Sequence, residues 1–323
     1  MELSISKSLA HPHALLKKIG DCYGQDFIEG VLLQSRENDV YKITSYSNTY
    51  ILKIYSVSAS SNKFLGPKID SINTLFSNQY GEDYVFQNRR GSFIQSLIYP
   101  EGERMAVLYR HFESIEKGRG EVSLFKYGIE IANFHELRTI GLENESSPLT
   151  DSEDIVLSVK LDNQTKFELF EFIEYIESYP QENLKYLEKG LCHGDCHLGN
   201  VIETKNGLRL IDFDYVNVNY VICDLVTMLW SHLYEMGANS EDIKSFFSGY
   251  SEVRTLPSAT LDDVIYFLVR KEICYLLTYL SRQSTIGTIF VHDGLVAGRL
   301  KKLRNIIKAK KQIAIFKLLT QSC

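Results

Sequence analysis

The residues best suited to chemistry lie in one polar stretch, Cys192–Asn200, followed by an acidic stretch at Leu210–Asp214. Apolar runs flank both, and polar side chains set between apolar strands need partners or a solvated cleft. Asp195, Asn200 and Asp212 carry the carboxylate and amide oxygens that Mg²⁺ prefers as ligands. Asp195 and Asn200 are spaced as Asp-x-x-x-x-Asn. In phosphoryl transfer, such a loop places a base against the acceptor hydroxyl and an amide oxygen on the metal.

The same chemistry needs a cation on the nucleotide phosphates, because it depends on positioning and on neutralising phosphate charge. Lys53 lies in the alternating segment Tyr50–Tyr55, as a Lys does in the Val-Ala-Ile-Lys strand of kinases. A lone Lys in a strand is usually a solvated residue. The assignment of Lys53 to the phosphates therefore depends on the predicted hairpin upstream and the Asp/Asn loop downstream.

These motifs resemble those of the aminoglycoside phosphotransferase and choline kinase-like family, whose fold is similar to that of eukaryotic protein kinases. His193-Gly194-Asp195-x-His197-x-x-Asn200 resembles the catalytic loop of that family, and Ile211-Asp212-Phe213-Asp214 resembles its metal-binding strand. Gly128-(x)6-His135 resembles the helix before the loop, and Asp224 stands where the family keeps an Asp that braces the loop. The resemblance spans roughly residues 25 to 230.

The segment Ser35–Tyr41, followed by Lys53, is also similar to the bacterial stress-response kinase branch. In that branch a Glu-Asn-x-Val-Tyr hairpin covers the nucleotide. Two departures from the family pattern stand beside this likeness. The family's helix supplies a Glu to pair with the strand Lys, whereas Asp70 is the only acid between Lys53 and Glu82. The usual Gly-Pro before the bracing Asp is replaced by Val218–Val221.

The resemblance implies ATP and Mg²⁺ as cofactors and a role for each matching residue. Asp195 would accept the proton of the acceptor hydroxyl, while Asn200 and Asp212 would hold Mg²⁺. Lys53 would bind the ATP phosphates, and the turn after the first strand would offer backbone N–H groups to them. The residues assigned to the nucleotide are Lys53, Ser35, Arg36, Glu37, Asn38 and Asp70. The residues assigned to shaping the loop are His193, His197, Asp214 and Asp224.

Hydrophobic patterning predicts the elements that must position these residues. The N-terminal part is expected to be one antiparallel sheet with a single helix. Its strands are predicted at 27–34, 40–44, 50–55, 92–99 and 104–110, and its helix at 67–79. The later part is expected to be mostly helical. Its helices are predicted at 125–137, 166–190 and from 224 to the end, its loop at 143–163, and short strands at 191–213 with an Asn206-Gly207 hairpin.

The predicted fold class is therefore α+β, a protein-kinase-like bilobal fold. Residues 1–110 would form a β-rich nucleotide-binding lobe, and residues 111–323 a mostly helical catalytic and substrate-binding lobe. Each lobe of such a chain is long enough to bury its own core.

Charge and composition narrow the class of protein. The net charge is −6, from 35 Lys and Arg against 41 Asp and Glu, and eight of the basic residues follow Asp293. An acidic body with a basic end does not suit a nucleic-acid binder, which needs a broad basic footprint. The basic end is better explained as the solvated face of a last amphipathic helix. No apolar run reaches a membrane span and no secretory pattern opens the chain, so we expect a soluble, cytoplasmic protein without nucleic-acid or membrane partners.

Acidic residues at helical spacing offer one hint about the acceptor. Glu168, Glu171, Glu174 and Glu177 would attract a cationic molecule such as an aminosugar, although a solvated helix face is the simpler explanation. The opposite face carries Phe167, Phe170 and Tyr179, which are expected in the core.

The predicted function is an ATP- and Mg²⁺-dependent phosphotransferase acting on a hydroxyl of a small molecule: an aminoglycoside-like antibiotic, a sugar or another metabolite. Two alternatives stay open. One is a Ser/Thr protein kinase of the stress-response type. The other is a non-catalytic nucleotide-binding pseudokinase, which the missing helix Glu favours and which the intact Asp195, Asn200 and Asp212 disfavour.

Overall fold

The computed structural model describes residues 7–35, 37–60, 65–115, 123–138, 142, 149, 151–233, 240–283, 288 and 291–309. They form two compact units. The described part of the first ends at Glu113 and takes in Leu142, and the second is made of the other described residues from Ser114 onward. None of the described helices is long and apolar enough to cross a membrane.

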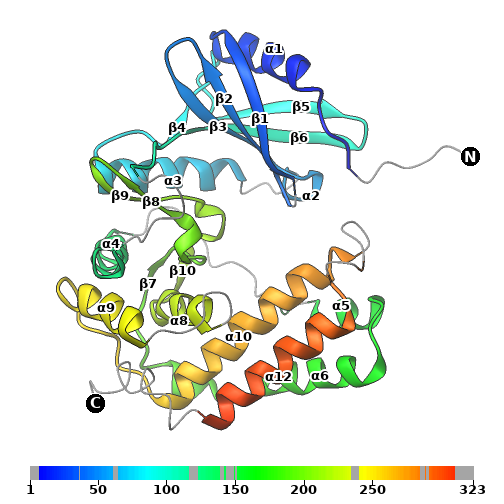
Figure 1. The fold of residues 1–323 in the computed structure, drawn as a ribbon, viewed down its shortest axis with the longest axis vertical. Coiled ribbons are helices and arrows are strands. Elements are labelled where there is room, and N and C mark those ends of the chain that lie inside the picture. The colour runs from blue at the N-terminus through cyan, green and yellow to red at the C-terminus, as the bar shows by residue number, and fades with distance from the viewer. Residues whose placement is uncertain are drawn as a thin grey trace, which may run out of the picture. The chain divides into compact units, whose positions relative to one another are not determined.

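The first unit is an antiparallel sheet with helices (Figure 1). Its strand order is β1-β2-β3-β6-β4, and β5 pairs with β6. The strands are β1 (Phe27–Ser35), β2 (Asp39–Ser45), β3 (Thr49–Ile54), β4 (Val85–Phe86), β5 (Ile94–Tyr99) and β6 (Gly102–Arg110). The helices are α1 (Pro12–Tyr23), α2 (Val57–Ser60) and α3 (Leu65–Tyr80).

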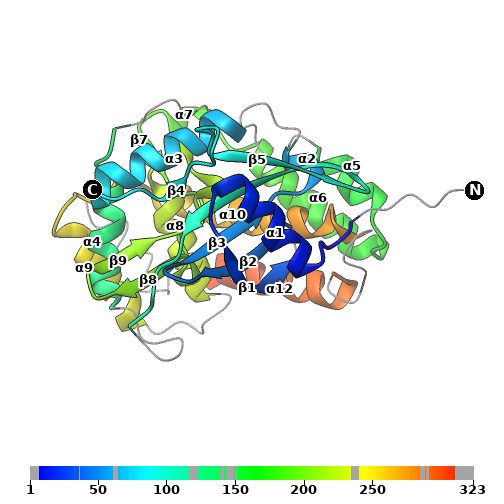
Figure 2. The ribbon, with the colours of Figure 1, turned by 90° about the horizontal axis from the view of Figure 1, so that it is seen from above.

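Alternation along the strands decides which face of this sheet is buried. In β2 the odd-numbered residues from Asp39 to Ser45 are buried and the intervening ones are half-buried. The buried side chains Tyr41, Ile43 and Leu52 pack with Leu16 and Ile19 of α1 in one core cluster. Figure 2 shows α1 lying across β1, β2 and β3. The opposite face carries Lys53, whose register partner on β2 is Val40.

Three elements of this unit were not predicted: α1, the short α2 and β4. The segment before the first strand forms α1, which begins at Pro12 and ends at Tyr23, and Gly24 follows it in a left-handed conformation (φ 73°). Pro near the start and Gly just past the end are the usual limits of a helix. The short β4 pairs with β6 through Val85 and Phe86 and is too brief to show a sequence period.

The second unit is mostly helical and holds two small sheets, β7–β10 and β8–β9. Its helices are α4 (Leu124–His135), α5 (Ser152–Ser158), α6 (Asn163–Glu177), α7 (Gln181–Leu184), α8 (Ile222–Ser231), α9 (Ser240–Ser251), α10 (Leu261–Leu280) and α12 (Asp293–Ala309). Its strands are β7 (Lys189–Cys192), β8 (Val201–Thr204), β9 (Gly207–Leu210) and β10 (Asn217–Tyr220), and its 3₁₀ helices are η1 (Leu198–Asn200) and η2 (Phe213–Tyr215).

Helix contacts organise this unit. Long helix α10 packs against α8 and α6, and α12 packs against both α6 and α10 (Figure 1). Helices α4 and α9 cross so closely that a Cβ on Gly128 would lie 2.0 Å from the carbonyl oxygen of Phe246. The reciprocal contact joins Gly249 to the carbonyl of Phe125. Gly128 of the sequence motif is therefore needed for the crossing of two helices.

Several predicted boundaries in this unit were wrong. The expected loop at 143–163 contains α5, and the expected helix at 166–190 is interrupted after Glu177. Pro180 follows, and the residue before a proline is disfavoured in a helix. The hairpin predicted at Asn206-Gly207 is present between β8 and β9, and Gly207, the first residue of β9, takes φ +99°. Phe167 is 60% exposed and does not belong to the core.

Candidate active site

The polar loop predicted from the sequence follows β7 and makes a tight turn at Gly194. This residue has φ +80°, and a Cβ there would lie 2.3 Å from the carbonyl oxygen of Tyr215. Only glycine therefore fits. The loop then enters η1, where the His197 ring accepts a hydrogen bond from the Gly199 N–H at 3.0 Å. These two local constraints set the direction of the side chain between them, Asp195.

The carboxylate of Asp195 is held from both of its oxygens. Lys271 of α10 donates to Oδ1 at 3.1 Å. The amide Nδ2 of Asn200 donates to Oδ2 at 3.2 Å and to the Asp195 carbonyl at 2.9 Å. The Nε2 of His197 lies 3.5 Å from Oδ2. The Asp195 side chain remains 27% exposed, so it keeps an open side.

Asp195 is ionised in this environment. Burial alone would raise its pKa, but the His197 hydrogen bond and the positive charge of Lys271 hold the pKa well below its usual range. A carboxylate of such low basicity serves better to orient a hydroxyl and receive its proton late than to remove that proton in advance.

Buried Asp224 braces the loop from below. Its Oδ2 accepts the His193 N–H at 2.6 Å and its Oδ1 accepts the Gly194 N–H at 2.9 Å. The His135 ring contacts the same carboxylate at 3.1 Å, and Tyr250 contacts the other ring nitrogen of His135 at 3.0 Å. Burial would raise the pKa of Asp224, but the hydrogen bonds from His135 and from the Gly194 N–H keep it lowered. The predicted brace thus has a physical basis in these contacts.

The ring of His193 links the loop to the next strand. It is fully buried, and burial lowers its pKa, so the ring is neutral near pH 7. Nε2 donates to the Ile211 carbonyl at 3.0 Å, and Nδ1 accepts the Asp195 N–H at 3.3 Å. One neutral tautomer satisfies both bonds.

The β8–β9 hairpin brings Asn200 and Asp212 together. Val201 pairs with Leu210, and Ile211 donates its N–H to the Asn200 carbonyl at 3.0 Å. Asp212 follows with φ +60°, the one left-handed non-glycine among the described residues. Such backbone strain clusters at functional sites. Asp214 lies two residues on, half-buried in η2.

The donor chemistry at this point fits a hard divalent cation. With Nδ2 turned toward Asp195, the Asn200 Oδ1 faces away from that carboxylate. Asp212 adds a carboxylate one hairpin later. Amide and carboxylate oxygens are the ligands that Mg²⁺ takes, usually together with phosphate oxygens and water.

In the first unit, Lys53 lies on β3 with only 8% of its surface exposed. Its ammonium is 5.5 Å from the ring centroid of Tyr55, whose hydroxyl hydrogen-bonds that of Tyr109 at 2.7 Å. Asp70 lies on the exposed side of α3, where its backbone carbonyl accepts from Thr74. A pairing of Asp70 with Lys53 stays a prediction.

The side chains of the β1–β2 turn hold the turn itself. Ser35 donates to Asp39 Oδ1 at 2.6 Å, and Asn38 accepts the Ser56 N–H at 3.1 Å. Asp39 is fully buried and pairs with Lys7 at 2.9 Å and Arg104 at 2.8 Å. Sequence patterns gave no sign of this ion cluster. The nearby Glu37 is half-buried, and Arg36 lies outside the described residues.

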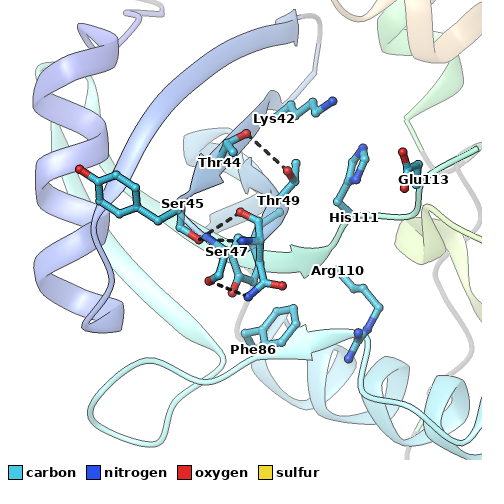
Figure 3. A pocket seen from close by; sticks show the side chains of 12 residues that line it. Lys42, Thr44, Ser45, Ser47, Thr49, Phe86, Arg110, His111 and Glu113 are labelled. Atoms are coloured by element: carbon cyan, nitrogen blue, oxygen red, sulfur yellow. Dashed lines mark hydrogen bonds between the residues drawn. The ribbon is translucent and has the colours of Figure 1, made fainter.

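The first unit also contains a polar cavity of about 590 Å³ (Figure 3). Lys42, Thr44 and Thr49 line it from β2 and β3, and Arg110 and His111 line it from the end of β6. Thr44 of β2 lies opposite Thr49 of β3 at one end of this strand pair, and Val40 lies opposite Lys53 toward the other end. Because side chains alternate along strands, Lys42, Thr49 and Lys53 share one face of the sheet.

Two functional contacts were not predicted. Lys271 reaches Asp195 across 76 positions of sequence, and Tyr250 completes the hydrogen-bonded series below Asp224. The one available signal for Lys271 was the charged run Arg270-Lys271-Glu272 inside an otherwise apolar helix. For Tyr250 no sequence signal existed.

Two other groupings have structural explanations. His135, Cys192 and Asp224 lie close enough to hold a metal ion, but all three are buried. Burial raises the pKa of the Cys192 thiol well above its usual value, and a protonated thiol is a poor ligand. On α6, Glu168 and Glu171 pair with Arg304 of α12 at 3.0 Å and 2.7 Å. Two of the four acids of the stripe therefore share one arginine, which offsets one of their two charges.

Part of the chain matches a known family model. Residues 121–259, which include Asp195, Asn200, Asp212 and Asp224, match the family model described as "Phosphotransferase enzyme family". The match confirms the predicted resemblance to aminoglycoside phosphotransferases and choline kinase-like proteins. It also confirms the prediction of a phosphotransferase.

Individual relatives are distant but extend over nearly the whole chain. The amicoumacin kinase of Bacillus subtilis (strain 168) is 22% identical over 304 residues, covering 87% of this chain and 89% of that one. A solved amicoumacin kinase in complex with AMP-PNP, Ca²⁺ and Ami has a TM-score of 0.68 at 18% identity and covers 94% of both chains. A spectinomycin phosphotransferase in complex with ADP and spectinomycin has a TM-score of 0.64 at 16% identity, covering 98% of this chain and 100% of that one. These likenesses confirm the predicted kinase-like fold.

Proposed function

We propose that this phosphotransferase is a small-molecule kinase that uses ATP and Mg²⁺ to phosphorylate a hydroxyl of a small polar molecule. The observation that carries the proposal is the arrangement around Asp195. An ionised, partly exposed carboxylate lies against Asn200, and the β8–β9 hairpin sets Asp212 beside Asn200. This set supplies a proton acceptor and cation ligands at one place.

In the proposed mechanism Asp195 receives the acceptor hydroxyl as a hydrogen-bond donor and takes its proton as the oxygen bonds to the γ-phosphorus. Asn200 and Asp212 would hold Mg²⁺, which when bound would neutralise charge on the phosphates. Asp224 and His193 keep the loop rigid, so that Asp195 needs little reorganisation during the reaction.

The first unit would bind the rest of the nucleotide. Lys53 offers its ammonium to the phosphates, and the polar cavity lies about 13 Å along the same sheet face, four residues at roughly 3.3 Å each. We place the nucleoside end of ATP in that cavity. His111, whose pKa is lowered by burial and by nearby Lys42, would be a neutral hydrogen-bonding group there. Thr49→Phe should then raise the KM for ATP and leave the KM for the acceptor unchanged, and equal KM values for ATP would refute the placement.

The acceptor class follows the relatives, whose names specify amicoumacin and spectinomycin. The test is ADP formation by the full chain with ATP and Mg²⁺ against a panel of these antibiotics, amino alcohols and sugars. We expect one class to stimulate ADP formation and to gain one phosphoryl group by mass spectrometry. A protein substrate phosphorylated in place of every small molecule would instead support a protein kinase. If the chain binds nucleotide but phosphorylates neither a small molecule nor a protein, the result would support a non-catalytic pseudokinase.

A further inference from the structure

We propose that Lys271 of α10 is a positioning residue for the transfer, acting through Asp195. Its ammonium fixes Oδ1 of the Asp195 carboxylate, opposite the Asn200 and His197 contacts at Oδ2, so that the carboxylate presents its open side to the acceptor hydroxyl in one fixed direction. The proposal rests on the function proposed above and adds to it a residue from outside the catalytic-loop and metal-strand motifs.

The geometry at Lys271 is that of a fixed clamp. Its Nζ donates to Asp195 Oδ1 at 3.1 Å and to the Gly194 carbonyl at 3.2 Å. One cation thus ties both the side chain and the backbone of the loop. The Lys271 side chain is 21% exposed, so it is partly removed from water. An ion pair in such a place is screened less than one at the surface.

A rigid support underlies this clamp. The Lys271 ammonium lies 5.6 Å from the ring centroid of Trp230 on α8, and Trp230 is almost fully buried. The Trp230 indole N–H donates to Glu272 at 2.6 Å, and Arg299 of α12 pairs with Glu272 at 2.6 Å and 2.8 Å. Because Glu272 is fully buried, its charge is stable only with these partners. Three helices are therefore joined directly beneath Lys271.

This arrangement affects both the direction and the charge of Asp195. The titratable groups that face Asp195 are Lys271 from α10 and His197 and His193 from its own loop, while Asp212 and Asp224 act on the loop through their negative charge. In the transfer, the acceptor O–H bond breaks and its proton goes to Asp195. The acceptor oxygen bonds to the γ-phosphorus of ATP, and the bond to the bridging oxygen breaks to release ADP. The Lys271 cation then favours loss of the proton from Asp195 and restores the carboxylate.

The test compares Lys271→Met, Lys271→Gln and Lys271→Arg with Lys301→Met, a matched change at an exposed lysine of α12. We expect kcat to fall by ~10–100-fold in the first two variants, because misplacement of a reacting group has a cost of this order. The KM for ATP should stay within about twofold, and Lys271→Arg should recover part of kcat.

A second readout does not require activity. Crystal structures of wild type, Lys271→Gln and Lys301→Met record the direction of the Asp195 carboxylate. We expect the carboxylate to turn from its wild-type direction in Lys271→Gln and to keep that direction in Lys301→Met. An unchanged carboxylate direction in Lys271→Gln together with kcat within twofold of wild type would overturn the role of Lys271. An inactive wild type whose Asp195 carboxylate still turns in Lys271→Gln would contradict the proposed function and retain the contact between Lys271 and Asp195.

Discussion

At the residue scale, the behaviour of Asp195 depends on the charges around it more than on its own exposure. Its side chain is 27% exposed, yet each oxygen has a donor and its pKa is held low by His197 and Lys271 after the opposing effect of burial. The residue is therefore preorganised as an anion. That state suits a group that orients a hydroxyl and accepts its proton as the new bond forms.

Replacing Asp195 with Asn should separate binding from chemistry. Asn keeps the shape of the side chain but cannot accept the proton, so kcat should fall by ~10²–10⁴-fold. The affinity for ADP and Mg²⁺ should change little, because Asp195 acts on the acceptor. Calorimetric titration with ADP and Mg²⁺, beside steady-state kinetics, measures the two effects. Near-normal turnover in Asp195→Asn would remove Asp195 from the catalytic role.

The brace at Asp224 makes a prediction about pH and stability. Its pKa is lowered in the folded protein, so its contribution is fully present above the unfolded pKa of an Asp and is lost as pH falls through the folded value. Asp224→Asn should lower the free energy of unfolding at pH 7 by about 3–5 kcal/mol, as expected when one partner of a buried pair is removed.

Urea unfolding at pH 7 and near pH 3 measures this effect. The gap between Asp224→Asn and wild type should be large at pH 7 and should shrink near pH 3, because the unfolded wild-type chain then binds a proton that folded Asp224 resists. The exposed Asp26→Asn provides a matched control with little effect at either pH. A gap that stays constant with pH would show that the charge of Asp224 does not stabilise the loop.

At the scale of elements, the close crossing of α4 and α9 places His135 and Tyr250 below the loop. Gly128 and Gly249 allow the crossing, since a Cβ at either position would overlap a backbone carbonyl of the other helix. His135 then reaches Asp224 from α4, and Tyr250 reaches His135 from α9. The shape of the loop therefore depends on the packing of two helices that bear none of the proposed transfer residues.

Gly128→Ala should be clearly destabilising. Its new Cβ would meet the Phe246 carbonyl oxygen at 2.0 Å, and relief requires the helices to separate. Overpacking of this kind costs about 1–3 kcal/mol or more. The control is Gly298→Ala on α12, where a Cβ meets nothing within 4 Å, and the better helix propensity of Ala should stabilise by roughly 0.5–1 kcal/mol. Equal unfolding free energies for the two variants, from denaturant titration, would refute the account of the crossing.

At the scale of the whole molecule, the sequence was most informative where function and local chain geometry coincide. The alternation in Asp39–Ser45 and Thr49–Ile54 predicted two strands of the first unit, and the loop motif predicted that Asp195 and Asn200 would act together. A loop this short has few possible conformations, so two residues five positions apart in it, such as Asp195 and Asn200, must lie close together.

Features that depend on distant contacts could not be predicted in this way. In the sequence, Lys271 looks like any charged residue of an amphipathic helix. Only the packing of α10 in the folded protein brings it to Asp195. Helix α5 forms in a polar stretch because Val156 finds a buried place against neighbouring helices, which no local signal shows. The exposure of Phe167 could not be predicted for the same reason. Helix α6 buries a face that contains Leu169, Phe172 and Ile173, and Phe167 does not belong to that face.

The most direct measurement is a thermal-shift titration of the full chain with ATP, with and without Mg²⁺, in wild type and Asp212→Asn, because it requires no knowledge of the acceptor. Binding to the folded state adds RT ln(1 + [L]/Kd), which is about 2.7 kcal/mol at ~100-fold saturation. The account predicts stabilisation of wild type that depends on Mg²⁺ and is largely lost in Asp212→Asn. No stabilisation by ATP, or stabilisation that is equal with and without Mg²⁺, would contradict it.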